Sequence, residues 1–237
     1  MIRAWAVGAV LAAALSLAPG AGATSPSSPP AGSVEIARIV VATPVRALPT
    51  PQSALRGLLS AIRPLTRQQT AVPVVRHALD PHDAEWLLVR LPGRPVGRVG
   101  WISATNAVVG RSPWRLVVNR NARQATLYRY GRVKMRVPVV VGAPWTPTPK
   151  GHYFVAEHVK QAPGSFLGPW ALATSAFSHV LQEFDGGPGQ IALHGRAGEL
   201  LADPLGTAAS HGCVRFDNEV IRTLARLLPN GTSIDIV

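Results

Sequence analysis

The chain has 237 residues, and its 24 Lys and Arg against 12 Asp and Glu give a formal net charge of +12. Such a charge suits an anionic partner, but the basic residues are dispersed without a run or a stacking motif, which argues against nucleic acid. A single cysteine, Cys213, excludes an intramolecular disulfide. In an exported chain a leftover cysteine indicates a reactive thiol or an intermolecular bridge; the alternative is a buried thiol acting as a small apolar group.

The N-terminus has the residue order of a secretory signal peptide. One positive charge at Arg3 precedes an apolar run over 5–17, and a Pro-Gly break leads to the small residues Ala21-Gly22-Ala23. This order predicts a signal peptide over 1–23, cleaved after Ala23. The alternative is an uncleaved anchor, but the run is shorter than the roughly 20 apolar residues of a spanning helix. We therefore expect an exported protein of the cell wall or periplasmic space.

Residues 24–33 are rich in Ser, Pro, Gly and Ala and have no apolar period, which predicts a flexible linker. Over 34–110, short apolar runs rich in β-branched and aromatic residues alternate with turn residues, which predicts strands. The runs cover 36–42, 72–75, 86–91 and 99–102. Between the first two runs, one helical face is expected, with Pro64 as its stop. That face consists of Leu55, Leu58, Leu59 and Ile62.

The segment 34–110 resembles a bacterial SH3-like β-barrel. The resemblance lies in Thr43-Pro44-Val45-Arg46, in residues 86–95 and in the closing Gly100-Trp101-Ile102. The predicted helix departs from a minimal barrel. The resemblance implies a module that binds the wall or positions a catalytic domain, with a structural spacer as the alternative.

From Trp114 onward, alternating and apolar runs separated by turns predict a hairpin-rich antiparallel sheet. The expected strands cover 116–118, 125–130, 133–141, 153–156, 191–193 and a closing segment over 232–237. Before the last strand, one helical face follows the capping pair Asp217-Asn218. That face consists of Val220, Ile221, Leu224, Leu227 and Leu228. The length allows two small domains, each with its own core.

The segment that indicates chemistry is Ser210-His211-Gly212-Cys213-Val214-Arg215, with His194-Gly195 upstream at the end of a predicted strand. A thiol is a good nucleophile only as a thiolate, so it needs a base or a positive field nearby. Gly212 leaves room for a carbonyl to reach the backbone N–H groups of Gly212 and Cys213, an expected oxyanion hole. Arg215 would hold a carboxylate.

In these residues the chain resembles the L,D-transpeptidases with the YkuD-type catalytic domain, from Trp114 to Val237. Their signature is a His, one residue, a loop, then Ser-His-Gly-Cys, an apolar residue and Arg or Asn. Supporting matches are 139–142, Thr148-Pro149-Lys150-Gly151 and 230–236. The resemblance implies a mainly β fold. An antiparallel, β-sandwich-like catalytic domain with a C-terminal helix would occupy 111–237, after the SH3-like barrel over 34–110.

The resemblance also implies roles for the residues. Cys213 is the expected nucleophile, His194 the general base, and the Gly195 carbonyl the group that orients the imidazole. Gly212, with the Cys213 N–H, would stabilise the oxyanion. The expected substrate-binding residues are Ser210, His211 and Arg215; for His211 and Arg215 a structural role is the alternative.

Family members attack the L-centre carbonyl of diaminopimelate in a peptidoglycan tetrapeptide stem, expel D-Ala and pass the acyl group to an amine, which gives a 3→3 cross-link. That chemistry implies no metal or organic cofactor. Zinc held by His194, His211 and Cys213 is an alternative, but the spacing fits no familiar site. The expected partners are stem peptides, carbapenem-type inhibitors and, given the charge, anionic wall polymers.

Other functions fit the sequence less well. A papain-like peptidase places its Cys before its His, whereas no histidine follows Cys213. A sortase-like transpeptidase fits the order His, Cys, Arg, but its nucleophile strand does not resemble Ser-His-Gly-Cys. The third alternative is a non-catalytic wall-binding protein carried by the SH3-like segment. The acceptor stays open among a second stem, a wall protein, a D-amino acid and water.

Overall fold

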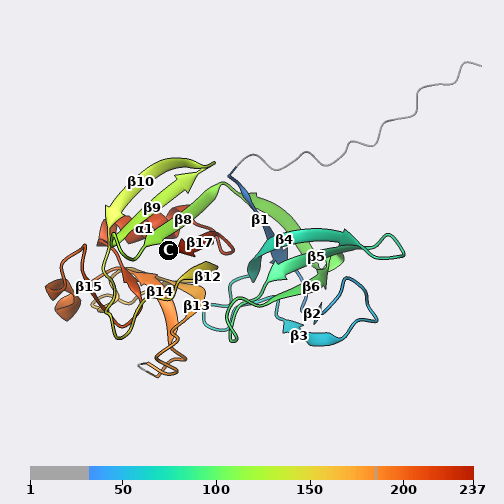
Figure 1. The fold of residues 1–237 in the computed structure, drawn as a ribbon, viewed down its shortest axis with the longest axis horizontal. Helices are drawn as coiled ribbons and strands as arrows, with labels where there is room; N and C mark the ends of the chain where they lie inside the picture. Colours follow the sequence, from blue (N-terminus) through green and yellow to red (C-terminus); the bar gives the residue numbers. More distant parts are fainter. Residues whose placement is uncertain (1–31, 185) are drawn as a thin grey trace, which may run out of the picture.

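The computed structural model describes residues 32–184 and 186–237. The predicted signal peptide over 1–23 and most of the predicted linker lie outside the described residues. The described residues are mainly β, with two large sheets that lie side by side, a separate pair of short strands and one α-helix (Figure 1). No helix in the described ranges is long and apolar enough to cross a bilayer.

The N-terminal sheet has seven strands in the order β3-β2-β6-β5-β4-β1-β7, and all its pairings are antiparallel. The strands are β1 (Val34–Ile39), β2 (Thr43–Arg46), β3 (Leu55–Leu59), β4 (Ala71–Leu79), β5 (Glu85–Arg90), β6 (Val99–Ser103) and β7 (Ala107–Ser112), with a short 3-10 helix at Ala104–Asn106. The four strands predicted in this segment correspond to β1, β4, β5 and β6. The SH3-like character of this sheet remains a prediction.

The helix predicted around residues 55–62 is wrong, because the segment forms β3 and pairs with β2. Gly57 has φ +147°, a conformation outside the helical region that glycine tolerates. Leu55 and Leu58 are 63% and 70% exposed, so much of the predicted apolar face is not packed against a core. A helix this short needs such packing, since propensity alone does not stabilise it in water.

The C-terminal sheet has eight strands in the order β10-β9-β8-β17-β12-β13-β14-β16. The strands are β8 (Trp114–Asn119), β9 (Gln124–Arg129), β10 (Arg132–Pro138), β12 (Gly151–Lys160), β13 (Trp170–Phe177), β14 (Gln190–His194), β16 (Val214–Arg215) and β17 (Ser233–Ile236). A separate parallel pair joins β11 (Val141–Gly142) to β15 (Ala208–Ser210). A 3-10 helix at Gly198–Ala202 lies between β14 and β15.

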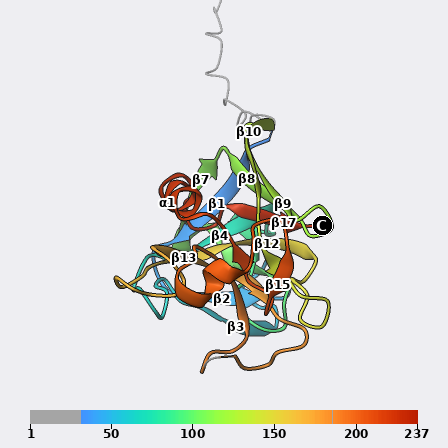
Figure 2. The same cartoon turned by 90° about the vertical axis from the view of Figure 1, so that its left-hand side faces the viewer.

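The expectation of an antiparallel sheet holds for most pairings, but β17 runs parallel to β8 and β16 runs parallel to β14. Parallel neighbours need crossover connections, and both of these strands follow long connections. Helix α1 (Asn218–Leu227) lies beside this sheet (Figure 2) and buries Ile221 and Leu224 in its core. As the sequence predicts, Asp217 caps α1 by accepting a hydrogen bond from the Glu219 N–H.

Strand β12 belongs to the C-terminal sheet, but its side chains contribute to the cores of both sheets. Tyr153 and Val155 lie in the core of the C-terminal sheet, whereas Phe154 and Ala156 lie in the core of the N-terminal sheet. A polar contact reinforces the junction: the buried Glu157 carboxylate accepts hydrogen bonds from the Thr66 N–H (2.7 Å) and hydroxyl (2.8 Å). The two sheets thus have two cores that meet at β12, and the domain bounds at residues 110 and 111 stay a prediction.

Candidate active site

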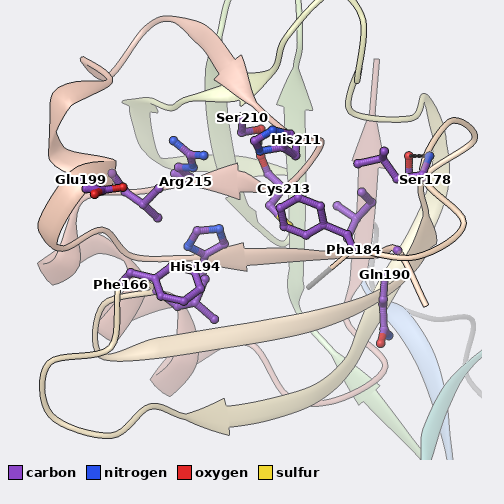
Figure 3. Close-up of a pocket in the computed structure, with 15 residues that line it drawn as sticks. Phe166, Ser178, Phe184, Gln190, His194, Glu199, Ser210, His211, Cys213 and Arg215 are labelled. Carbon is purple, nitrogen blue, oxygen red and sulfur yellow. Dashed lines mark hydrogen bonds between the residues drawn. The ribbon is translucent and has the colours of Figure 1, made fainter. Parts of the chain in front are cut away.

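A cavity of about 550 Å³ opens on the C-terminal sheet, and both His194 and Cys213 line it (Figure 3). His194 is the last residue of β14, and Cys213 lies in the loop between β15 and β16. Because β14 and β16 are neighbours in the sheet, residues far apart in the sequence meet at one wall. Much of the remaining wall is apolar, including Phe166, Leu181, Phe184, Ile191 and Leu200.

His194 is only 3% exposed, and its Nδ1 lies 2.7 Å from the Gly195 carbonyl oxygen. A carbonyl only accepts, so Nδ1 carries the proton and the lone pair of the neutral ring lies on Nε2. Burial lowers the pKa of His194 to about 4; the bond to Gly195 raises this pKa and the Arg215 charge lowers it. At neutral pH the imidazole is therefore uncharged and able to accept a proton.

Asn218, at the start of α1, clamps the peptide that orients His194. Its Oδ1 accepts from the Arg196 N–H and its Nδ2 donates to the Arg196 carbonyl, both at 2.9 Å. A Cβ on Gly195 would lie 2.3 Å from the same Oδ1 and 2.9 Å from Pro169, so this position requires glycine. The sequence indicated Asn218 only as part of a helix cap.

The Cys213 sulfur accepts a hydrogen bond from the Ala192 N–H at 3.4 Å. Burial raises the pKa of the Cys213 thiol, and the Ala192 N–H and the Arg215 charge counteract that effect in part. At neutral pH the cavity therefore holds a protonated thiol and an uncharged imidazole.

Ser210 is buried, and its hydroxyl is both a hydrogen-bond donor and an acceptor within the nucleophile loop. The hydroxyl donates to the Cys213 carbonyl (2.5 Å) and accepts from the Gly212 N–H (3.1 Å). The Gly212 N–H is thus paired with Ser210 in this structure, and its expected part in an oxyanion hole stays a prediction. Gly212 also contributes its conformation, since its φ of +117° is one that L side chains rarely adopt.

The remaining expected residues also reach the cavity. His211 is exposed, and its ring stacks on Phe184. Arg215 is 6% exposed and pairs through one terminal nitrogen with Asp203, so the ion pair given as its alternative role is present. Its Nε is buried and has no hydrogen-bond partner among the described residues. In residues 32–184 and 186–237, no three His, Cys, Asp or Glu side chains are grouped to hold a metal.

The N-terminal sheet contributes to this site through Arg94, which precedes β6. Its guanidinium lies 5.0 Å from the centroid of the Phe177 ring and donates to the Ser178 carbonyl at 3.0 Å. Weaker contacts reach the carbonyls of Leu181 (3.4 Å) and Pro188 (3.3 Å). Arg94 therefore fixes the segment after β13, which supplies a wall of the cavity. No signal in the sequence indicated this contact.

A thiol and an imidazole of fixed tautomer in one cavity are the catalytic groups that a cysteine enzyme needs. The model of the L,D-transpeptidase catalytic domain named YkuD matches residues 113–236, more than half of the sequence. The chain belongs to this family of cysteine enzymes, which act on the cell wall.

Three known proteins illustrate the similarity. The protein named "Putative L,D-transpeptidase YkuD" of Bacillus licheniformis is 29% identical over 124 residues, covering 52% of this chain and 66% of that protein. The match thus spans slightly less than two thirds of the relative. L,D-transpeptidase 3 from Mycobacterium tuberculosis, solved with a faropenem-derived adduct, is 14% identical with a TM-score of 0.47, covering 70% and 90% of the two chains. LdtMt1, solved with imipenem, is 15% identical with a TM-score of 0.43, covering 71% and 91%.

Proposed function

We propose that this chain is a peptidoglycan L,D-transpeptidase. The Cys213 sulfur attacks the L-centre carbonyl of diaminopimelate in a tetrapeptide stem, while His194 Nε2 takes the thiol proton. The tetrahedral intermediate collapses to a thioester, and the proton returns to the amine of the departing D-Ala. An amine on an acceptor stem then attacks the thioester, gives up a proton to His194 and leaves a 3→3 cross-link and the free thiol.

The observation that carries this proposal is the hydrogen bond from His194 Nδ1 to the Gly195 carbonyl in a cavity that also holds Cys213. It directs the lone pair to Nε2, the nitrogen that a general base needs. Because the pKa of His194 is lowered and that of the thiol is raised, proton transfer accompanies attack instead of preceding it. A concerted transfer needs no thiolate–imidazolium pair before the attack.

Defined tetrapeptide muropeptides test the proposal. The full chain is incubated with them, and the products are identified by mass spectrometry. We expect release of D-Ala together with a dimer whose mass and fragmentation indicate a 3→3 bond, and neither product with Cys213→Ala. Parallel reactions with an added D-amino acid and without any added amine distinguish the possible acceptors. Turnover of a sorting-signal peptide, with no reaction of the tetrapeptide stem, would instead favour the sortase-like alternative.

We propose further that residues 1–23 are a signal peptide for export and that residues 34–110 assist association with the wall. Exposed cations in this segment, such as Arg56 and Arg76, support the second point. Removing the whole segment would uncover Phe154, so the test uses the full chain with Arg56→Gln and Arg76→Gln together. We expect weaker pull-down by intact sacculi than with the matched pair Arg132→Gln and Lys134→Gln in the C-terminal sheet. Equal pull-down by the two variants would reject the role.

A further inference from the structure

Thr148 is fully buried and does not line the cavity, yet its hydroxyl contacts the backbone of the nucleophile loop. Its Oγ1 accepts from the Gly142 N–H and donates to the Gly212 carbonyl, both at 2.8 Å. A hydroxyl has a single hydrogen. Since the Gly142 N–H already points at the oxygen, that hydrogen must lie toward Gly212. The direction of the bond is therefore fixed by the fold.

The Gly212 carbonyl and the Cys213 N–H belong to the same planar peptide. In a trans peptide these two groups point in opposite directions, so a carbonyl held toward buried Thr148 turns the Cys213 N–H away from it. Among the described residues no acceptor pairs with the Cys213 N–H, whereas Ser210 occupies both the Gly212 N–H and the Cys213 carbonyl. Next to the sulfur, the Cys213 N–H is thus the donor left for a substrate.

We propose that Thr148 is a positioning residue that aims the Cys213 N–H at the oxyanion formed during acylation. The inference rests on the proposed function, because it assumes attack of Cys213 on a carbonyl. The chain from Gly142 through Thr148 to Gly212 also polarises the peptide, which makes the Cys213 N–H a stronger donor. The Thr-Pro-x-Gly match thereby gains a physical role: its threonine orients the nucleophile loop through the Gly212 carbonyl without lining the cavity.

Thr146 provides a matched control. Its hydroxyl is also buried and donates to the Ser210 carbonyl at 3.1 Å. The peptide that it holds carries the His211 N–H and lies two residues before the peptide that carries the Cys213 N–H. Thr146→Val thus removes a buried hydroxyl from the same loop without releasing the Cys213 N–H, and the Ser210 carbonyl keeps its hydrogen bond from the Ala143 N–H.

The test compares two reactions of Cys213 in Thr148→Val, Thr148→Ser, Thr146→Val and wild type. Imipenem acylates through a carbonyl and needs an oxyanion donor, whereas iodoacetamide alkylates at a saturated carbon and needs none. We expect Thr148→Val to lower the acylation rate about 10²–10³-fold, the effect of removing one oxyanion donor. Its alkylation rate should stay that of wild type, Thr148→Ser should restore acylation, and Thr146→Val should acylate nearly normally.

Three results would overturn the inference: equal losses of acylation and alkylation in Thr148→Val, equal losses of acylation in Thr146→Val and Thr148→Val, or unchanged acylation in Thr148→Val. If Thr148→Val does not fold by circular dichroism, Thr148→Ala replaces it, with the same expected ratio of the two rates. A wild type that is alkylated but never acylated would refute the proposed function as well. Normal wild-type acylation with no effect of Thr148→Val refutes this inference alone.

Discussion

The rings of His211 and Phe184 stack with centroids 4.9 Å apart and planes inclined by 30°. This contact ties the nucleophile loop to the segment after β13, and Figure 3 shows the two rings beside Cys213. His211 thus forms part of the cavity wall, and its position two residues before the thiol makes it a second histidine to test as the general base. His194 differs in having its tautomer fixed by Gly195.

The two histidines should therefore differ in kinetic effect. We expect His194→Ala to lower the imipenem acylation rate by about 10²–10⁴-fold, the usual contribution of a general base. His211→Ala should mainly weaken binding, seen as a higher reagent concentration at half-maximal rate, because it removes a wall and not a proton acceptor. Stopped-flow acylation, with circular dichroism as the folding control, measures both. A larger loss of maximal rate in His211→Ala than in His194→Ala would reverse the assignment.

Arg215 should influence the reactivity of Cys213 through its charge. That charge lowers the pKa of the thiol and of His194, so Arg215→Gln should raise both pKa values. The released partner, Asp203, is one-third exposed and remains solvated. We expect the midpoint of the alkylation rate against pH to move upward in Arg215→Gln and to stay unchanged in Arg222→Gln, an exposed arginine of α1. A midpoint that falls in Arg215→Gln would contradict this electrostatic role.

The buried His194 should also make stability depend on pH. Its pKa of about 4 in the folded protein lies below the ordinary value of about 6.5 in the unfolded chain. Between these values the unfolded state binds more protons, so the free energy of unfolding rises with pH there. Between pH 7 and pH 5, the titration of His194 alone should lower the free energy of unfolding by about 2 kcal/mol.

Denaturant titrations at pH 5 and pH 7 measure this dependence. His194→Gln should show a smaller difference between the two pH values than wild type, while His82→Gln, an exposed substitution outside the cavity, serves as the matched control. An identical pH dependence in wild type and His194→Gln would rule out the lowered pKa.

The sequence predicted the residues of the site better than the residues that hold them in place. His194 and Cys213 were found because their chemistry and spacing form a local pattern. Thr148, Asn218 and Arg94 act through contacts with residues distant in the chain, so no periodicity reports them. Strand β13 was missed because its three alanines weaken the strand signal, although the structure buries nearly all of it. The helix wrongly predicted at 55–62 shows the converse. An apolar period predicts a helix only where the apolar face can pack against a hydrophobic core.

Arg94, from the loop between β5 and β6, should keep the cavity wall after β13 ordered. Arg94→Met keeps a long apolar stem over Phe177 but removes the donors to the Ser178 carbonyl. We expect faster hydrogen exchange in peptides that cover the segment between β13 and β14, and slower acylation by muropeptides, whose large contact area needs an ordered wall. Arg98→Met, which removes only a contact within its own loop, is the matched control. Equal exchange in the two variants would show that Arg94 does not hold the segment.

The most direct measurement is the intact mass of the full chain after reaction with imipenem, a carbapenem that acylates thiols through its lactam carbonyl. The account predicts a single covalent adduct on wild type, located at Cys213 by peptide mapping, and none on Cys213→Ala. The alanine variant must show the wild-type circular dichroism spectrum, so that loss of the adduct reports loss of the sulfur. An adduct on Cys213→Ala, or a wild-type protein that stays unmodified while its thiol still reacts with iodoacetamide, would contradict Cys213 as the acylated nucleophile.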